Sequence, residues 1–223
     1  MSRTLLLFSG GLDSTVALWK ILAEGSEVFL LNIQYYRRNP KEFEAALRIA
    51  SMCSNKGMIT VEMPFLKEIY DYEHEVKQYW MKTLNNPLTV MAPFRNIIFY
   101  SVAAHIASQI RAERVVGGHV KEDTLNLPDA NPRYLEHLNN ILHESLGVEA
   151  VKIEAPLINL TKVEAVKLGM ELKAPLNHTW SCWASGPGHC GKCPGCNARK
   201  RVFKEAGYID TTTYYEHLQI WRP

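Results

Sequence analysis

A segment near the N-terminus, Ser9 to Thr15, has the residue types and spacing of an anion-binding loop. It follows an apolar run over residues 4–8 and precedes apolar residues at helical spacing over residues 16–22. This pattern predicts a strand, a tight loop and a helix. Gly10 and Gly11 allow a sharp turn and a close approach by a ligand, because they carry no Cβ. We expect the free N–H groups of this loop to bind a phosphate or pyrophosphate.

Three polar residues complete the chemistry of this loop. Ser14 and Thr15 are expected to cap or open the helix. Asp13 lies beside the expected anion site, where a carboxylate is suited to hold Mg²⁺ or to orient the loop. The segment lacks the lysine of a G-x-x-x-x-G-K-[ST] loop. An ordinary strand–turn–helix also uses Gly-Gly, but the position directly after the first apolar run favours the anion site.

Four of the five cysteines form a second group near the C-terminus: Cys182, Cys190, Cys193 and Cys196. Four thiolates at this spacing can complete the tetrahedral shell of one Zn²⁺. His189 is an alternative ligand, but the cysteines already fill the site. An iron–sulfur cluster uses the same four ligands, and a redox C-x-x-C pair is a weaker alternative. We expect a structural zinc site that contributes on the order of 10–16 kcal/mol in apparent binding free energy.

Strands and helices alternate along the chain, which predicts an α/β fold with an open, mainly parallel sheet and helices on both faces. Ligands of such sheets bind beyond the carboxyl ends of the strands. Those ends carry the glycine loop, residues 34–38 and the long loop at 119–132. Thr161 and Glu164 form the pattern of a capping box. We expect strands at 4–8, 27–33, 58–63, 114–117 and 151–155, and helices at 16–24, 40–54, 66–82, 97–110, 133–146 and 160–172.

Size and charge limit the possible classes of protein. A chain of 223 residues with 47% hydrophobic and 22% charged residues is globular. We expect an α/β domain over residues 1–176 and a zinc-binding C-terminal lobe over residues 177–223. The net charge of +2 gives no general attraction to nucleic acid. The sequence has neither an apolar run of about 18 residues nor a targeting signal, so we expect a cytoplasmic protein without a membrane span.

The loop S-G-G-L-D-S-T resembles the pyrophosphate-binding loop of the N-type ATP pyrophosphatases, which cleave ATP between the α and β phosphates. Together with T-W-S-C and C-G-x-C-x-x-C near the C-terminus, it resembles the 7-cyano-7-deazaguanine synthase (QueC) family. The resemblance covers nearly the whole chain and includes the Pro93-x-Arg95-Asn96 and Pro128-Asp129 segments. It implies an adenine nucleotide alpha hydrolase-like fold, Zn²⁺ on the four cysteines, and ATP on Phe8, Ser9, Gly10, Gly11, Leu12, Asp13, Ser14, Thr15, Val16, Ala17 and Leu18.

The family converts a carboxyl group on a 7-deazaguanine to a nitrile, using ammonia and two ATP, for queuosine- and archaeosine-type nucleosides. Asp13, Ser14 and Lys162 are then the expected catalytic residues, with Lys162 steadying phosphate charge. Arg95 is suited to hold a carboxylate or phosphate with parallel donors. The other expected substrate-binding residues are Phe94, Asn96 and Asp129. Without the resemblance, Lys162, Arg95, Asn96 and Asp129 are most simply surface ion pairs or helix caps. The family also implies a homodimer.

Two departures from the family pattern fall where the substrate is expected. Phe94 stands where the family has a small residue, and Thr124 to Ala130 replaces the family's S-G-Y-P-D-C. These changes leave the ATP and zinc assignments intact. They leave open an alternative function, in which a related ligase adenylates a deazaguanine acid and couples it to a protein or another amine.

A third hypothesis is a zinc module that binds nucleic acid through the basic residues Arg199, Lys200, Arg201 and Lys204. The near-neutral net charge favours a solvated helix face instead. Other ATP pyrophosphatases, such as tRNA thiolases or NAD synthetase, are alternatives among enzymes. A thiolase needs catalytic cysteines near the loop, and only Cys53 remains for that role; its helical surroundings predict a small buried residue.

Overall fold

The computed structural model describes residues 2–35, 38–64, 95–146 and 151–215. A sheet of five parallel strands in the order β3-β2-β1-β4-β5 forms its centre. This confirms the predicted parallel α/β sheet. The strands are β1 (Arg3–Leu7), β2 (Glu27–Tyr35), β3 (Met58–Met63), β4 (Arg114–Val116) and β5 (Lys152–Glu154).

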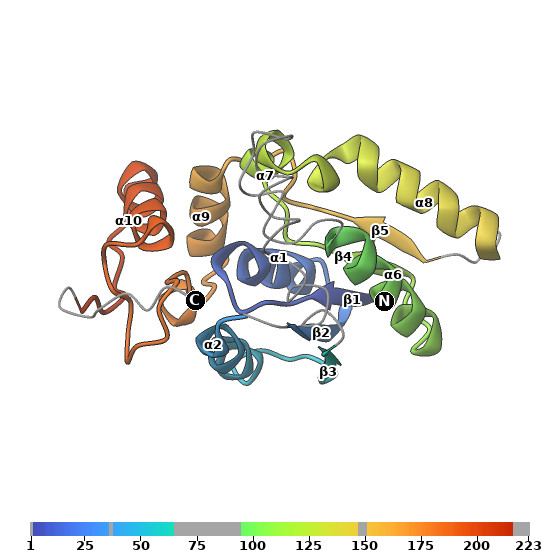
Figure 1. The fold of residues 1–223 in the computed structure, drawn as a ribbon, viewed down its shortest axis with the longest axis horizontal. Coiled ribbons are helices and arrows are strands. Elements are labelled where there is room, and N and C mark those ends of the chain that lie inside the picture. Colours follow the sequence, from blue (N-terminus) through green and yellow to red (C-terminus); the bar gives the residue numbers. More distant parts are fainter. Residues whose placement is uncertain (1, 36–37, 65–94, 147–150, 216–223) are drawn as a thin grey trace, which may run out of the picture.

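The described helices form two groups around the sheet. Figure 1 shows α9 beside α1 with α10 beyond it at the left, and α6 and α8 at the right. One buried cluster joins the sheet to α1, α2, α9 and α10, and another joins it to α6 and α8. The α-helices are α1 (Leu12–Ala23), α2 (Pro40–Ala50), α6 (Arg95–Gln109), α7 (Lys121–Asn126), α8 (Pro132–Leu146), α9 (Lys162–Glu171) and α10 (Pro194–Ala206); 3₁₀ turns lie at Pro128–Ala130 and Leu176–His178.

Alternating side chains of the central strands supply both cores. Leu6 and Leu30 belong to the cluster with α1, whereas Leu5 and Leu31 belong to the cluster with α6. Successive strand residues point to opposite faces. A parallel strand covered on both faces therefore has a nearly continuous apolar sequence.

The direction in which successive strands are added changes between β1 and β4. From β1 the chain adds β2 and β3 on one side, and it then adds β4 and β5 on the other side of β1. Ligands of such sheets bind at this switch point. The loop after β4 is in close contact with the first turn of α1 there: a Cβ on Gly118 would lie 2.9 Å from Ser14 Cα. A glycine is therefore needed at position 118.

Some element boundaries differ from the predictions. The helix predicted over 40–54 ends at Ala50, whose carbonyl accepts a hydrogen bond from Asn55 Nδ2 at 2.7 Å. Cys53 therefore lies outside the helix, and it is half-buried instead of buried as predicted. The predicted loop at 119–132 contains α7, because Asp123 Oδ2 accepts from Val120 N at 3.1 Å at its start. The capping box of Thr161 and Glu164 is confirmed. The helix predicted over 66–82 lies outside the described residues.

Within the described ranges, no helix combines the length and the apolar character that a membrane span needs.

Candidate active site

The loop after β1 places backbone and hydroxyl groups at the switch point. Gly11 caps α1 and donates its N–H to Ser9 Oγ at 3.1 Å, while Ser9 Oγ lies 3.0 Å from Ser14 Oγ. The first amides of a helix have no acceptor within the helix. Partial positive charge at this helix end favours an anion. The arrangement fits the predicted phosphate site.

Ser14 and Thr15 fix the first turn of α1 in a way that differs from the prediction. Both hydroxyls donate to the Gly11 carbonyl, at 3.2 and 2.8 Å, and neither acts as the helix cap. Thr15 is fully buried, as are the apolar residues that follow it to Leu18. Residues 15–18 of the predicted ATP-binding segment are therefore core residues that hold the loop in place from below.

Gly10 is required by the neighbouring helix, which corrects the expectation that its missing Cβ makes room for a ligand. Its φ is +83°, and a Cβ there would lie 2.4 Å from Glu42 O and 2.6 Å from Ala46 N in α2. The Gly10 carbonyl accepts from Trp180 N at 3.0 Å. The loop therefore packs between α2 and Trp180, which lies close to the cysteines in sequence.

Asp13 and Lys162 form an ion pair at the loop, with 3.3 Å between Lys162 Nζ and Asp13 Oδ2. Burial raises the pKa of Asp13 against the opposing effect of Lys162, and Asp13 in turn raises the pKa of Lys162. Glu122 accepts from Lys162 N at 2.9 and 3.0 Å and so fixes the start of α9. Asp13 Oδ1 is buried and has no hydrogen-bond partner among the described residues. An orphaned carboxylate oxygen of this kind fits a Mg²⁺ ligand.

A cavity of about 360 Å³ opens beside the loop and extends between the ends of β1, β2 and β4. We call the loop residues that line it the loop end: Ser9, Gly11, Leu12, Asp13 and Ser14. Another side is lined by four residues of one helix, the α6 wall: Arg95, Asn96, Phe99 and Tyr100. Arg95 and Phe99 are four positions apart, as are Asn96 and Tyr100, so each pair is stacked on the same side of the helix. Further polar lining comes from Tyr35, Arg38, Glu42 and His119.

Two of the described residues that were predicted to bind substrate line this cavity, and Asp129 does not. Arg95 lines it and places its guanidinium over the Phe99 ring, 5.8 Å from the ring centre. Asn96 also lines it, and its Nδ2 donates to the Asp129 carbonyl at 3.0 Å. Asp129 Oδ2 accepts from Asn96 N at 3.3 Å, so this carboxylate holds the start of α6. Phe94 lies outside the described residues.

Sequence reasoning did not single out Tyr100, His119 or Arg38. Burial lowers the pKa of His119, which keeps the imidazole neutral, although nearby carboxylates oppose this. Its ring lies 5.9 Å from that of Tyr100, whose buried hydroxyl has no partner in the described part of the chain. Arg38 donates to the Ser9 carbonyl at 2.7 Å and pairs with Glu42 at 3.3 Å. The available signal for Arg38 and His119 was their position after β2 and β4, and Tyr100 had no such signal.

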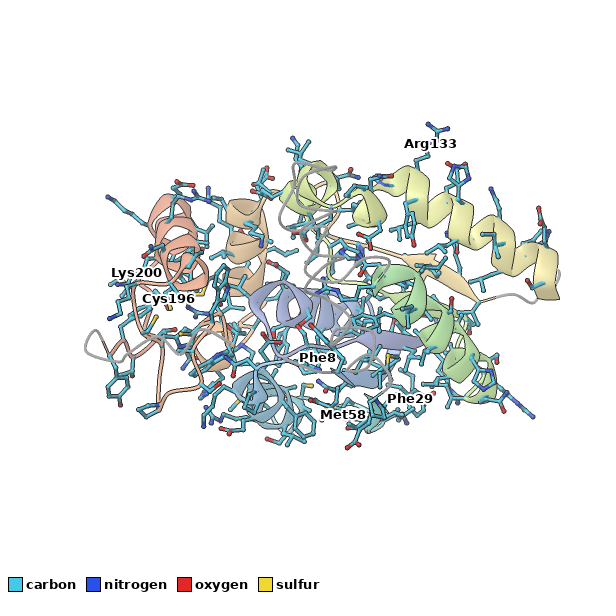
Figure 2. The ribbon with its side chains drawn as sticks, in the orientation of Figure 1. Phe8, Phe29, Met58, Arg133, Cys196 and Lys200 are labelled. Atoms are coloured by element: carbon cyan, nitrogen blue, oxygen red, sulfur yellow. The ribbon has the colours of Figure 1, made fainter. Side chains whose placement is uncertain are left out.

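The four cysteines converge on one point, as predicted. Their Sγ atoms all lie within 4.8 Å of one another, with 3.9 Å for both Cys190–Cys196 and Cys182–Cys193. One tetrahedral zinc with Zn–S bonds of about 2.3 Å requires sulfurs about 3.8 Å apart. An iron–sulfur cluster distributes its thiolates over several irons. The geometry therefore fits a single ion. Figure 2 shows Cys196 at the start of α10.

His189 is not needed as a ligand, in agreement with the prediction. Its Nε2 accepts from Ser181 N at 3.0 Å, and its ring lies 4.5 Å from that of Trp180. Burial, with a contribution from Arg199, lowers the pKa of His189 to about 4. The neutral ring packs within the cysteine lobe, by which we mean residues 177–215.

Arg199 is buried, so it is neither an exposed phosphate-binding residue nor part of a solvated face, and both predictions for it were wrong. Its guanidinium donates to Asp210 Oδ2 at 3.0 Å, to Thr179 Oγ1 at 2.6 Å and to the Leu176 carbonyl at 2.7 Å. Lys200 donates to the Gly191 carbonyl at 2.9 Å. Arg199 and Lys200 therefore help to hold the lobe together, whereas Arg201 and Lys204 are exposed, as a solvated helix face predicts.

Comparison with known proteins adds sequence and fold relationships. The family described as "Queuosine biosynthesis protein QueC" matches residues 3–207. A 7-cyano-7-deazaguanine synthase of Acetivibrio thermocellus is 37% identical, covering 97% of this chain and 99% of the relative. One of Oceanobacillus iheyensis is 35% identical, covering 95% and 98%. A 4-thiouridine synthetase in an RNA complex with bound ATP has a similar fold (TM-score 0.55, 16% identity), covering 92% of this chain and 50% of that chain.

Proposed function

The chain belongs to the QueC family, and on this premise we propose that it is an ATP-dependent ligase that converts 7-carboxy-7-deazaguanine and ammonia to 7-cyano-7-deazaguanine. This reaction belongs to the biosynthesis of queuosine- and archaeosine-type nucleosides. The observation that carries the proposal is the shared cavity, which joins an anion-binding helix start to a helix face bearing Arg95, Phe99 and Tyr100.

We propose that ATP binds with its phosphates at the loop end. The amides at the start of α1 are suited to hold them, and Lys162 supplies a positive charge next to Asp13. A Mg²⁺ ion on Asp13 would neutralise part of the phosphate charge. Support for this role comes from the buried and unpartnered Asp13 Oδ1. We assign Ser14 to the same phosphate contacts, because its hydroxyl lies 3.0 Å from that of Ser9.

We propose that the deazaguanine acid binds against the α6 wall. A planar base fits beside the aromatic rings of Phe99 and Tyr100. Arg95 is suited to hold the carboxylate through two parallel hydrogen bonds. Asn96 and Asp129 are further proposed recognition residues, and their mutual hydrogen bonds fix the first turn of α6. Phe94 is proposed to stack on the base.

The reaction needs no nucleophilic side chain. The substrate carboxylate attacks the α-phosphorus of ATP, and pyrophosphate leaves. Ammonia attacks the acyl carbon, AMP leaves, and loss of a proton gives the amide. The amide oxygen attacks a second ATP and releases pyrophosphate. Loss of AMP and of the two protons on nitrogen leaves the nitrile. The protein contributes orientation and charge stabilisation.

Three further features belong to the proposal. Residues 177–223 form the zinc-binding lobe beside an ATP pyrophosphatase domain over residues 1–176. Zn²⁺ on Cys182, Cys190, Cys193 and Cys196 is structural, because four thiolates leave no open position for catalysis. The protein acts as a homodimer in the cytoplasm, as its family resemblance implies.

Mass spectrometry of a reaction with ATP, ammonium and 7-carboxy-7-deazaguanine tests the proposed activity. We expect AMP, pyrophosphate and the nitrile, each dependent on the acid. Adenylation without nitrile at saturating ammonium would favour the related ligase that couples the acid to another amine. Salt-dependent RNA binding without turnover would favour a nucleic-acid-binding module.

A further inference from the structure

The position of Gly10 depends on two elements outside its own loop. On one side its Cα lies against the backbone of α2, where a Cβ would be 2.4 Å from Glu42 O. On the other side its carbonyl accepts from Trp180 N at 3.0 Å. Trp180 precedes the first cysteine of the metal site by two residues, and its Nε1 donates to the Cys182 carbonyl at 2.8 Å. The loop can be placed correctly only if α2 and the cysteine lobe are correctly placed relative to each other.

Asn39 connects these two elements directly. Its Nδ2 donates to the carbonyls of Cys182 and Ala184, both at 3.1 Å. Its Oδ1 accepts from Lys41 N at 3.0 Å and caps α2. A single side chain thus ties the first turn of α2 to the backbone of Cys182, the first proposed zinc ligand, and to that of Ala184 two residues later.

We propose that Asn39 is a positioning residue that couples the cysteine lobe to the phosphate-binding loop, so that zinc binding and ATP binding strengthen each other. The coupling runs from Cys182 through Asn39 to α2, and from α2 to Gly10. The inference rests on the proposed function only in placing ATP at the loop end. Coupling between two sites is reciprocal in binding free energy, so it can be measured from either ligand.

The two functions of the Asn39 amide can be separated by substitution. Asn39→Asp keeps an oxygen for Lys41 N, because aspartate is also a good helix cap, but loses both donors to the lobe. Asn39→Ser keeps a neutral cap and loses the same donors, which controls for the added charge. Ser185→Ala is the matched control, because it removes the hydroxyl 3.1 Å from Asn39 Oδ1 and leaves both donors intact.

Nucleotide affinity is measured on the zinc-loaded full chain by calorimetry with α,β-methylene-ATP. Loss of two hydrogen bonds of ordinary net strength predicts a Kd about tenfold higher in Asn39→Asp and Asn39→Ser. Ser185→Ala should stay within about twofold of the wild type. Elemental analysis should still find zinc in each variant, because all four cysteines remain. A mere capping role for Asn39 predicts no loss of affinity, since both substitutions keep the cap.

The reciprocal experiment measures zinc affinity by competition with a chelator, with and without the same nucleotide analogue. In the wild type the nucleotide should strengthen zinc binding, and in Asn39→Asp this effect should be clearly smaller, with the remainder carried by the Trp180–Gly10 hydrogen bond. An unchanged nucleotide Kd in both Asn39 variants, or a zinc affinity independent of nucleotide in the wild type, would overturn the coupling alone. Failure of the wild type to bind the analogue at all would overturn the proposed function and this inference together.

Discussion

The loop end and the α6 wall line one cavity but are built differently. The loop end comes from five residues between Ser9 and Ser14 and offers mainly backbone amides at the start of α1. The α6 wall offers side chains from one face of a helix. Its first turn is held by Asp129, which lies 33 positions away in the sequence. The loop end is contiguous in sequence, although α2 and Trp180 fix its position, whereas the α6 wall is held by a residue distant in the sequence.

This difference separates two kinds of function. Backbone amides respond to any phosphate of suitable geometry, so the loop end suits a nucleotide that many enzymes share. Side chains on a helix face can change without altering the helix, so the α6 wall can set which acid is accepted. We therefore expect loop-end substitutions to reduce every ATP-dependent step. Substitutions in the α6 wall should mainly change the use of the acid.

The largest expected effect comes from the zinc site that supports the loop end. Purified protein should contain about one Zn²⁺ per chain, because four sulfurs converge on one point. Removing the metal, or Cys196→Ser, should unfold the cysteine lobe and weaken nucleotide binding. Elemental analysis and thermal unfolding measure these changes. Iron with labile sulfide, or folded protein without metal, would contradict the assignment.

Asp13→Ala tests the loop end itself. Loss of the carboxylate leaves Lys162 without its ion-pair partner and removes the proposed Mg²⁺ ligand. AMP formation should fall by about 1000-fold, the upper range for one group that stabilises a transition state. Ser14→Ala should also abolish detectable AMP formation. Turnover at the wild-type rate by either folded variant would show that the loop is wrongly assigned.

Arg95→Lys tests the α6 wall with the charge retained. A lysine cannot make two parallel hydrogen bonds to a carboxylate, so kcat/KM for the acid should fall by about 100-fold. The KM for ATP should change little, because Arg95 is outside the loop end. Steady-state kinetics with each substrate varied in turn measures the contrast. An equal loss for both substrates would remove the distinction between the two regions.

Phe94→Ala is expected to have the smallest effect. If Phe94 stacks on the base, its loss should weaken binding of the acid by about 1–3 kcal/mol, the range for base–aromatic stacking. Calorimetry with the acid measures this directly. Phe94→Tyr is the matched control, because it keeps an aromatic ring. Equal acid affinity in the alanine variant would assign recognition to the described α6 wall alone.

Local sequence signals predicted much of this molecule. The parallel sheet, the loop after β1, the cap at Thr161 and the cysteine site all follow from residues close together in the chain. Gly10 was correctly placed in the loop, but its reason was not predictable, because the contact with α2 is tertiary. The same holds for Arg199, whose charge suggested exposure although Asp210 and three other acceptors surround it.

The α6 wall was the least predictable part of the site. Arg95 and Asn96 were identified through the family resemblance, whereas Phe99 and Tyr100 appeared to be ordinary apolar helix residues. His119 was recognised only as part of a polar loop after a strand. Their convergence requires α6, β4 and the 3₁₀ turn at Pro128–Ala130 to pack together, which no short pattern encodes.

A crystal structure of the protein with α,β-methylene-ATP and 7-carboxy-7-deazaguanine tests the division of the cavity most directly. We expect the nucleotide phosphates on the amides of the loop end, and the base beside Phe99 and Tyr100 with its carboxylate on Arg95. The acid should also point toward the α-phosphorus, as adenylation requires. A base bound away from the α6 wall, or phosphates away from the start of α1, would contradict the account.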